Sequence, residues 1–307
     1  MMIKRISKII LVAIFLFGIG LNSVVKASTN DNSDSINEKF GAPIVVYGEK
    51  LSADQKQKVK ELLGVNDSSQ VNEVTVTVDD LVKYINGDPH SNLYSSAKIT
   101  RKEKGEGLAI SIVTPDNITE VTEEMYANAL LTAGVEDANV EVASPVKVSG
   151  HSALVGIYKA YDKGGGDLNK DRMEVANDEL DLATNLAKKE GMDQEKVTQL
   201  LTEIKQAIAD QNPATKEDIE KIIDEKLKSL KIELSPKDRE LLVKLFDRMR
   251  DLNINFDNMK NQLGDIANNI KEKLKDVASD KGFWQGVADF FKKIFQAIAD
   301  FFSNLFG

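Results

Sequence analysis

The pattern of apolar and polar residues divides the chain into two different parts. Between residues 41 and 163, short β-branched or alternating runs are interleaved with helical stripes that end at capping residues or glycines. From residue 167 to residue 280 the strand signal disappears, and apolar residues recur at helical spacing. We therefore expect the α+β class: an N-terminal mixed-sheet α+β domain over 41–163 and an all-α helical region over 167–280.

The first part has the expected element order β-α-β-α-β-β-α-β-α. Expected strands cover 44–47, 74–78, 98–104, 108–113 and 138–148. Expected helices cover 52–63, 81–85, 122–133 and 152–161. The two strands on either side of Gly105-Glu106-Gly107 predict a hairpin. Because hairpin and crossover connections both occur, we expect a mixed sheet.

The second part follows a glycine-rich joint at 162–167 and contains successive amphipathic stripes. Asp193, Thr215 and Ser235-Pro236 have the composition of helix starts. The expected stripes cover 173–187, 197–208, 219–230, 241–252 and 256–277. Each stripe is apolar on one side only, so the helices must bury these sides together as a bundle or as hairpins. An elongated coiled-coil stalk is the alternative.

The N-terminus has the composition of a secretory signal peptide over residues 1–27. Cations at positions 4, 5 and 8 precede a charge-free apolar run over 9–21. A helix of about 13 residues is only about 20 Å long, which is short of the roughly 20 residues that span a bilayer. We predict cleavage between Ala27 and Ser28, because Val25 and Ala27 place small or modest side chains at positions −3 and −1. An uncleaved anchor is the alternative. Residues 28–40 are polar at their start and are expected to form a disordered mature N-terminus.

Charge and cysteine content narrow the possible partners. The chain has no cysteine, so a cysteine-linked lipid anchor and disulfides are excluded. Its net charge is −9, and removal of the four cations of the signal makes it −13. Such a surface disfavours nucleic acid, whose phosphates require neutralisation, and general adsorption to anionic lipid. Nucleic acid is therefore not an expected partner, and any membrane contact must be local and apolar.

The C-terminal segment 282–307 differs from the rest of the chain. It holds seven of the 12 phenylalanines and the single tryptophan, and its polar residues form a narrow strip of one residue or pair per turn. We predict an amphipathic hydrophobic helix. The residues expected to contact a membrane or a partner are Phe283, Trp284, Val287, Phe290, Phe291, Ile294, Phe295, Ile298, Phe301, Phe302, Leu305 and Phe306.

The apolar side chains of this segment need an apolar environment, because burial of each one contributes roughly 1.5–3 kcal/mol. Three environments are possible. The segment can dock on the chain's own bundle, lie in a membrane interface, or pair with another copy or another protein. The wide apolar arc favours the membrane surface over the chain's own bundle. Four charges in 282–307 disfavour a position across the bilayer.

Residues with the potential for chemistry do not form a motif. His90 and His151 stand apart from other ligand types, and no metal site is expected. The segment 167–178 resembles a calcium loop at its first positions, but Arg172 replaces the usual glycine and Asp178 the usual glutamate, which favours a polar linker entering a helix. We therefore predict no catalytic, cofactor-binding or metal-binding residue.

Several stretches together resemble a known family. They are 51–57 with 62–65, 118–130 with 132–135, 145–150 with 153–157, and 175–180. The most specific of these is the run Ile118-Thr119-Glu120-Val121-Thr122-Glu123-Glu124-Met125-Tyr126-Ala127-Asn128-Ala129-Leu130 with Thr132-Ala133-Gly134-Val135. The chain over roughly 41–276 resembles the YpuA-like family of predicted secreted proteins of Gram-positive bacteria. The resemblance implies export and a single architecture, and it implies no active-site residues.

The function expected from these observations is that of an exported, non-enzymatic envelope-associated or extracellular protein. It would bind or scaffold, with the helix 282–307 on a membrane surface or a protein partner. Two alternatives remain: an enzyme of the cell wall or matrix that uses carboxylates, and a secreted factor that acts on membranes.

Overall fold

The structure is a computed structural model, and it describes residues 39–189 and 192–279. The predicted signal peptide, the predicted cleavage site at Ala27 and Ser28, nearly all of 28–40 and the whole of 282–307 lie outside the described residues. Among the described residues, no helix combines the length and the apolarity needed to cross a bilayer.

A mixed sheet lies in the first part of the chain, as the pattern predicts. Its strands are β1 Ile44–Gly48, β2 Asn72–Val76, β3 Ser96–Arg101, β4 Leu108–Ile112 and β5 Ala138–Ala143. The spatial order is β2-β1-β3-β5-β4. The pairs β1–β2 and β4–β5 are parallel, whereas β1–β3 and β3–β5 are antiparallel. β2 and β4 are therefore the edges of this sheet.

The predicted hairpin between the third and fourth strands is wrong. β5 lies between β3 and β4, and it pairs with both of them. The glycine-containing loop bends toward the start of β5 instead, where the Asp137 carboxylate accepts hydrogen bonds from the Gly105 and Gly107 amides at 2.9 and 2.8 Å. The two runs are thus consecutive along the chain but not neighbours in the sheet.

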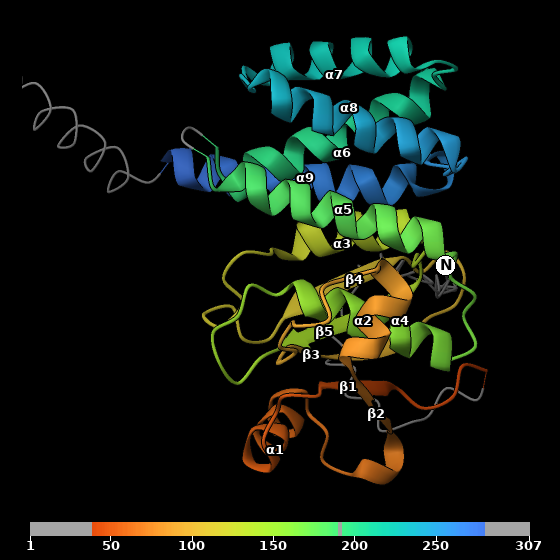
Figure 1. Cartoon of the computed structure of the whole chain (residues 1–307), viewed down its shortest axis with the longest axis vertical. Helices are drawn as coiled ribbons and strands as arrows, with labels where there is room; N and C mark the ends of the chain where they lie inside the picture. The colour runs from red at the N-terminus through yellow and green to blue at the C-terminus, as the bar shows by residue number, and fades with distance from the viewer. Residues whose placement is uncertain (1–38, 190–191, 280–307) are drawn as a thin grey trace, which may run out of the picture. The chain divides into compact units, whose positions relative to one another are not determined.

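Helices cover the two faces of the sheet unequally. They are α1 Ala53–Leu62, α2 Val78–Ile85, α3 Glu123–Ala133 and α4 His151–Lys163. α2, α3 and α4 pack on the face that belongs to the main core, and α1 covers part of the opposite face over Val45 and Tyr47 (Figure 1). α2 begins earlier than predicted, at Val78, because Thr77 and Asp80 form a capping box.

The second part is helical, and its helices pack into a bundle rather than a stalk. They are α5 Lys170–Ala187, α6 Gln194–Gln211, α7 Lys216–Leu230, α8 Pro236–Asp251 and α9 Lys260–Ser279, with a 3-10 turn at Asp257–Met259. α6 contacts α5, α7 and α9, and α8 contacts α5 and α7. The predicted starts at Asp193, Thr215 and Ser235 are confirmed, since each side chain accepts from an amide in the first turn of its helix.

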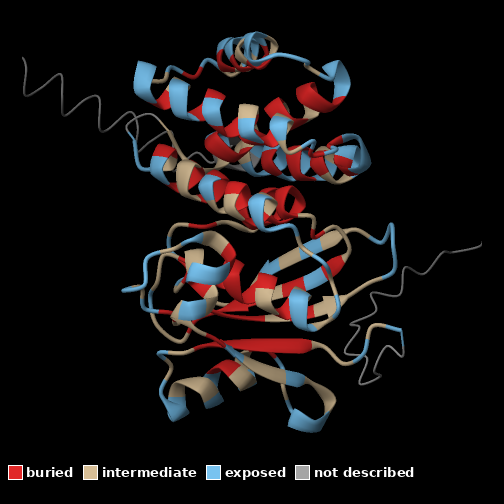
Figure 2. Ribbon diagram, turned by 45° about the vertical axis from the view of Figure 1, so that its right-hand side comes forward, coloured by how far each residue is buried: buried red, intermediate tan, exposed pale blue. Residues whose placement is uncertain are grey.

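One hydrophobic core joins the helices to the sheet. α5 packs along α3, and the core cluster runs from sheet residues such as Val140 through Leu180 on α5 to Ile204 on α6. Buried residues follow the inward stripe of each helix, and exposed residues follow the opposite side (Figure 2). The joint at 162–167 therefore links two parts that share their interior.

Candidate functional site

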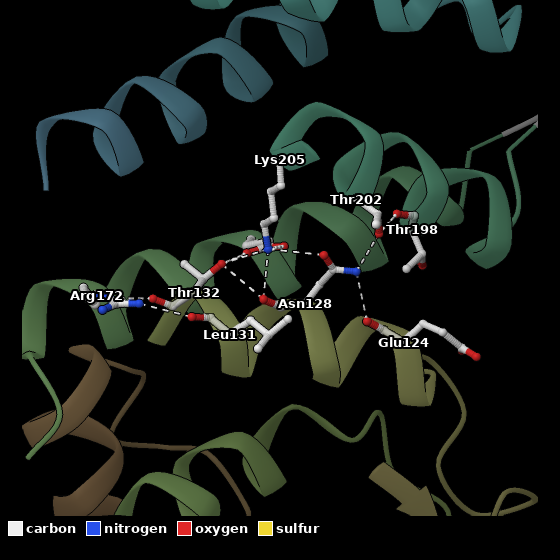
Figure 3. Close-up of polar contacts among 9 residues, drawn as sticks. Glu124, Asn128, Leu131, Thr132, Arg172, Thr198, Thr202 and Lys205 are labelled. Atoms are coloured by element: carbon white, nitrogen blue, oxygen red, sulfur yellow. Dashed lines mark hydrogen bonds and ion pairs between the residues drawn. The ribbon is translucent and has the colours of Figure 1, made fainter. Parts of the chain in front are cut away.

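The most unusual cluster of polar side chains is buried where α3, α5 and α6 meet. The Lys205 side chain of α6 is fully buried, and its ammonium group lies 2.5 Å from the Glu179 carboxylate of α5. The same ammonium donates to the Asn128 carbonyl at 2.9 Å and to the Thr132 hydroxyl at 2.8 Å, both on α3. Figure 3 shows Lys205 reaching from its helix to these acceptors. The lysine thus ties three helices together.

The cluster extends at both ends, through amide and hydroxyl groups at one end and through a guanidinium group at the other. The Asn128 amide donates to the Thr202 hydroxyl at 2.9 Å, and Thr202 in turn donates to the Thr198 carbonyl at 2.8 Å. At the other end, the Arg172 guanidinium donates to the Thr132 and Leu131 carbonyls, at 2.8 and 3.1 Å (Figure 3). These carbonyls lie in the last turn of α3, where a cation complements the helix dipole.

The electrostatics of this cluster indicate a structural role. Burial lowers the pKa of the Lys205 ammonium, whereas the charge of Glu179 and its hydrogen bond raise it. The Glu179 carboxylate accepts from Lys205 and, at 2.6 Å, from Thr132, so both of its oxygens have donors. Because Lys205 has no exposed surface, no substrate can reach it in this conformation. We assign the cluster to packing specificity rather than to catalysis.

This cluster was not among the features predicted from the sequence, although the sequence contains a signal for it. Glu124, Asn128 and Thr132 recur every fourth residue within α3, whose other residues after Glu123 are apolar. Thr198, Thr202 and Lys205 form a similar polar line beside the apolar stripe of α6. Polar residues on a buried helix face require partners, so such lines on two helices predict that the helices face each other.

His151 is the first residue of α4 and follows the N-cap residue Gly150. Its Nε2 lies 3.1 Å from the Thr184 hydroxyl and 3.3 Å from the Asp181 carboxylate. In a nucleophile–histidine–acid triad the acid and the nucleophile meet opposite ring nitrogens. Here both groups approach the same nitrogen, so this arrangement does not form such a triad.

The surroundings of His151 predict a pH-dependent stability. Burial lowers the pKa of the imidazole more than Asp181 raises it, and burial raises the pKa of Asp181. The folded protein therefore favours the neutral ring, and the unfolded chain binds the proton first as the pH falls through about 6.5. We expect His151 to lower the free energy of unfolding as the pH falls from 7 to 5, and the raised pKa of Asp181 to oppose this contribution as the carboxyl takes up its proton. His151→Gln should therefore reduce the fall in stability over this range in urea titrations.

The matched control is His90→Gln, which changes an exposed histidine in a turn. This control should keep the wild-type pH dependence. A slope that is equally steep in His151→Gln and in the wild type would contradict the assignment.

The remaining sequence candidates form no reactive site. Asn169 caps α5, and Arg172 and Asp178 lie within that helix, so the segment 167–178 is a linker that enters a helix as predicted. Within 39–189 and 192–279, no three His, Cys, Asp or Glu residues lie close enough together to hold a metal ion. The predicted contact residues between Phe283 and Phe306 lie outside the described residues.

Two hollows open on the described surface. One, of about 600 Å³, lies between the α6–α7 and α8–α9 connections. Asn212 and Asn253 line it, and both adopt left-handed backbone conformations just after the helices. The other, of about 320 Å³, is a groove between β4, α3 and α9. This second hollow, the β4 groove, places backbone groups of an edge strand beside several carboxylates.

Together, these features define an α+β protein with a mixed sheet, a packed helical bundle and a buried polar cluster between them. A model of a family described as "Protein of unknown function (DUF1002)" matches residues 47–266. The chain belongs to this family. It is also similar to the uncharacterized protein YpuA of Bacillus subtilis (strain 168), with 39% identity over 212 residues, which cover 66% of this chain and 70% of that protein. No solved structure matches the chain.

The family membership agrees with the resemblance predicted from the sequence, and the structure gives those stretches a physical meaning. Asn128 and Thr132 come from the most specific of them, and Glu179 comes from 175–180. The Tyr126 hydroxyl, from 118–130, donates at 2.6 Å to the carbonyl of Gly150, which belongs to 145–150. Segments that are distant in the sequence therefore meet in the buried interior.

Proposed function

We propose that this protein is an exported, non-enzymatic protein that binds or scaffolds at the cell envelope, and that 282–307 holds it on a membrane surface. The composition of this segment carries the proposal, because seven phenylalanines and the tryptophan lie within 26 residues. Their transfer from water to an apolar host is worth roughly 1.5–3 kcal/mol each. The apolar leader over 1–27 supports the exported location.

The surface of the described body supports a host outside this chain. Among the described residues, the large hydrophobic side chains that are exposed are Val82 on α2 and Leu241 on α8, at 40% and 42%. They lie singly on separate helices, and single exposed apolar residues are normal on a protein surface. The described helices bury their apolar stripes against one another, so they offer no broad apolar face for an aromatic segment.

Removal of the segment is expected to release the protein from the membrane. Cells that make the full chain should retain it in the membrane fraction, and cells that make a chain ending at Asp280 should yield it in soluble form, by immunoblotting of fractions. The reason is the loss of the apolar surface in 282–307. Because this segment carries only two Lys and two Asp, 1 M salt should extract little of the full chain.

Two variants of the full-length chain test whether the apolar side chains of 282–307, rather than the presence of the segment, hold the protein on the membrane. Phe290→Ser combined with Phe301→Ser should move part of the protein from the membrane fraction to the soluble fraction, whereas Gln285→Ala combined with Gln296→Ala should leave it with the membrane. Equal release of the full and truncated chains would exclude the anchor. Dye release from phosphatidylcholine vesicles by the full chain alone would point to a membrane-active factor instead.

A further inference from the structure

The β4 groove follows the free edge of the sheet. β4 pairs with β5 on one side only. The Val113 amide donates to the Val142 carbonyl at 2.8 Å, so the odd-numbered amides of this strand face β5. The amides of Leu108, Ile110 and Ile112 consequently face outward, away from the sheet.

Two of these three amides are satisfied by side chains from the neighbouring helices. The Gln262 carboxamide oxygen of α9 accepts from the Leu108 amide at 2.8 Å. The Glu123 carboxylate at the start of α3 accepts from the Ile112 amide at 2.8 Å. The Ile110 amide between them has no hydrogen-bond partner among the described residues. The edge is thus covered at its two ends and open at its centre, over about 13 Å of strand.

The lining of the β4 groove joins an apolar floor to an acidic rim. Its floor consists of Ala127, Leu131 and Ile266. Its rim carries four carboxylates, those of Glu106, Glu123, Glu124 and Asp265. No Lys or Arg is among the lining residues, although Lys273 lies 2.6 Å from Glu124.

The negative charge of the rim decides between two kinds of strand that could pair with the free edge of β4: a second copy of this chain and a separate peptide. A second copy paired through its own β4 would place identical acidic rims against each other, and such like-charge contacts are unfavourable. An extended peptide with a cationic side chain would meet opposite charge. Its aliphatic stem would cover the apolar floor while the cationic head stayed among the carboxylates.

We propose that the β4 groove binds an extended peptide that carries a Lys or Arg side chain. One residue of the peptide pairs with Ile110 in antiparallel orientation, so that it accepts from the Ile110 amide and donates to the Ile110 carbonyl. The side chain of that residue is the cationic one, and it reaches Asp265. Gln262 and Glu123 end the pairing on either side. The residues that line the site lie between Glu106 and Asn269, so the proposal does not depend on the proposed membrane role of 282–307.

The test is fluorescence anisotropy with the full-length protein and dye-labelled heptapeptides of alternating Thr and Val. The peptide with a central Lys should bind saturably, and the same peptide with a central Glu should bind at least about tenfold more weakly. Methylation of the central backbone nitrogen removes one donor and should weaken binding roughly fivefold.

Substitution of the protein gives a second, independent result. Asp265 is exposed on α9, so Asp265→Asn should leave the fold intact and weaken binding of the Lys peptide roughly fivefold. The matched control is Asp54→Asn, which removes an exposed carboxylate on α1 and should not change the affinity. Hydrogen exchange should show that saturating Lys peptide slows exchange of the Ile110 amide.

Four outcomes would overturn the proposal. They are no saturable binding up to 1 mM peptide, equal affinity for the Lys and Glu peptides, wild-type affinity in Asp265→Asn, and exchange of the Ile110 amide that is unaffected by the peptide. Slow exchange at Ile110 that accompanies dimerisation without peptide would assign the edge to a second copy. None of these measurements includes lipid, so they stand or fall separately from the anchor experiment.

Discussion

Lys205→Met is expected to lower the free energy of unfolding by about 3–5 kcal/mol, because it leaves a buried carboxylate without its counter-ion. Glu179 is only 2% exposed at its side chain, so water cannot replace the lost ammonium group. Thr132 and Asn128 lose a donor in the same substitution. Urea unfolding followed by circular dichroism measures the effect.

The double variant Lys205→Met with Glu179→Leu separates the charge from the packing. Replacement of both charged groups by apolar ones removes the uncompensated charge, so this variant should recover most of the lost stability. The control is Lys244→Met on α8, which breaks an exposed pair with Glu240 at 2.6 Å and should change stability by less than about 0.5 kcal/mol. A single Lys205 variant as stable as this control would show that the buried pair contributes little.

Gly48→Ala is expected to destabilise the sheet by about 3 kcal/mol, near the upper end of the usual range for overpacking. A Cβ at Gly48 would lie 2.3 Å from the Leu93 carbonyl oxygen and 2.6 Å from its carbon. These atoms belong to backbone, and the same carbonyl accepts from the Lys50 amide at 3.1 Å. β1 is paired on both sides, with β2 and β3, so it cannot shift to relieve the contact.

Gly264→Ala provides the comparison for the same chemical change. This glycine lies within α9, and a Cβ there meets no atom within 4 Å. Alanine should stabilise this position by up to about 1 kcal/mol because of its higher helix propensity. Thermal unfolding should therefore move in opposite directions for the two variants. A neutral result at Gly48 would mean that β1 and the segment at Leu93 can separate at little cost.

The elements that could be predicted from the sequence are those with local causes. Ser52 with Gln55, Thr215 with Asp218, and Ser235 before Pro236 mark helix starts, and each side chain contacts an amide only three residues away. The alternating and helical patterns likewise report which side of one element is buried. Such signals were sufficient for the fold class, the order of elements and the bundle.

The features that could not be predicted depend on residues far apart in the chain. The glycines of the loop between β3 and β4 indicate a turn. They do not indicate that β5, which comes later in the chain, lies between these two strands. Lys205 resembles any surface lysine of a charged helix until α3 and α5 supply its acceptors. The β4 groove has the same origin, because Gln262 reaches Leu108 across 154 positions of sequence.

The position of Lys205 also limits how this protein can be divided. A fragment that ends at the close of α5 would retain Glu179, Asn128 and Thr132 but lack the ammonium group that they surround. The Glu179 carboxylate would then lie without its counter-ion at the surface that α6 covers in the full chain. We therefore expect the sheet and the bundle to unfold together, and neither half to serve well as an autonomous module in a fusion or a truncation.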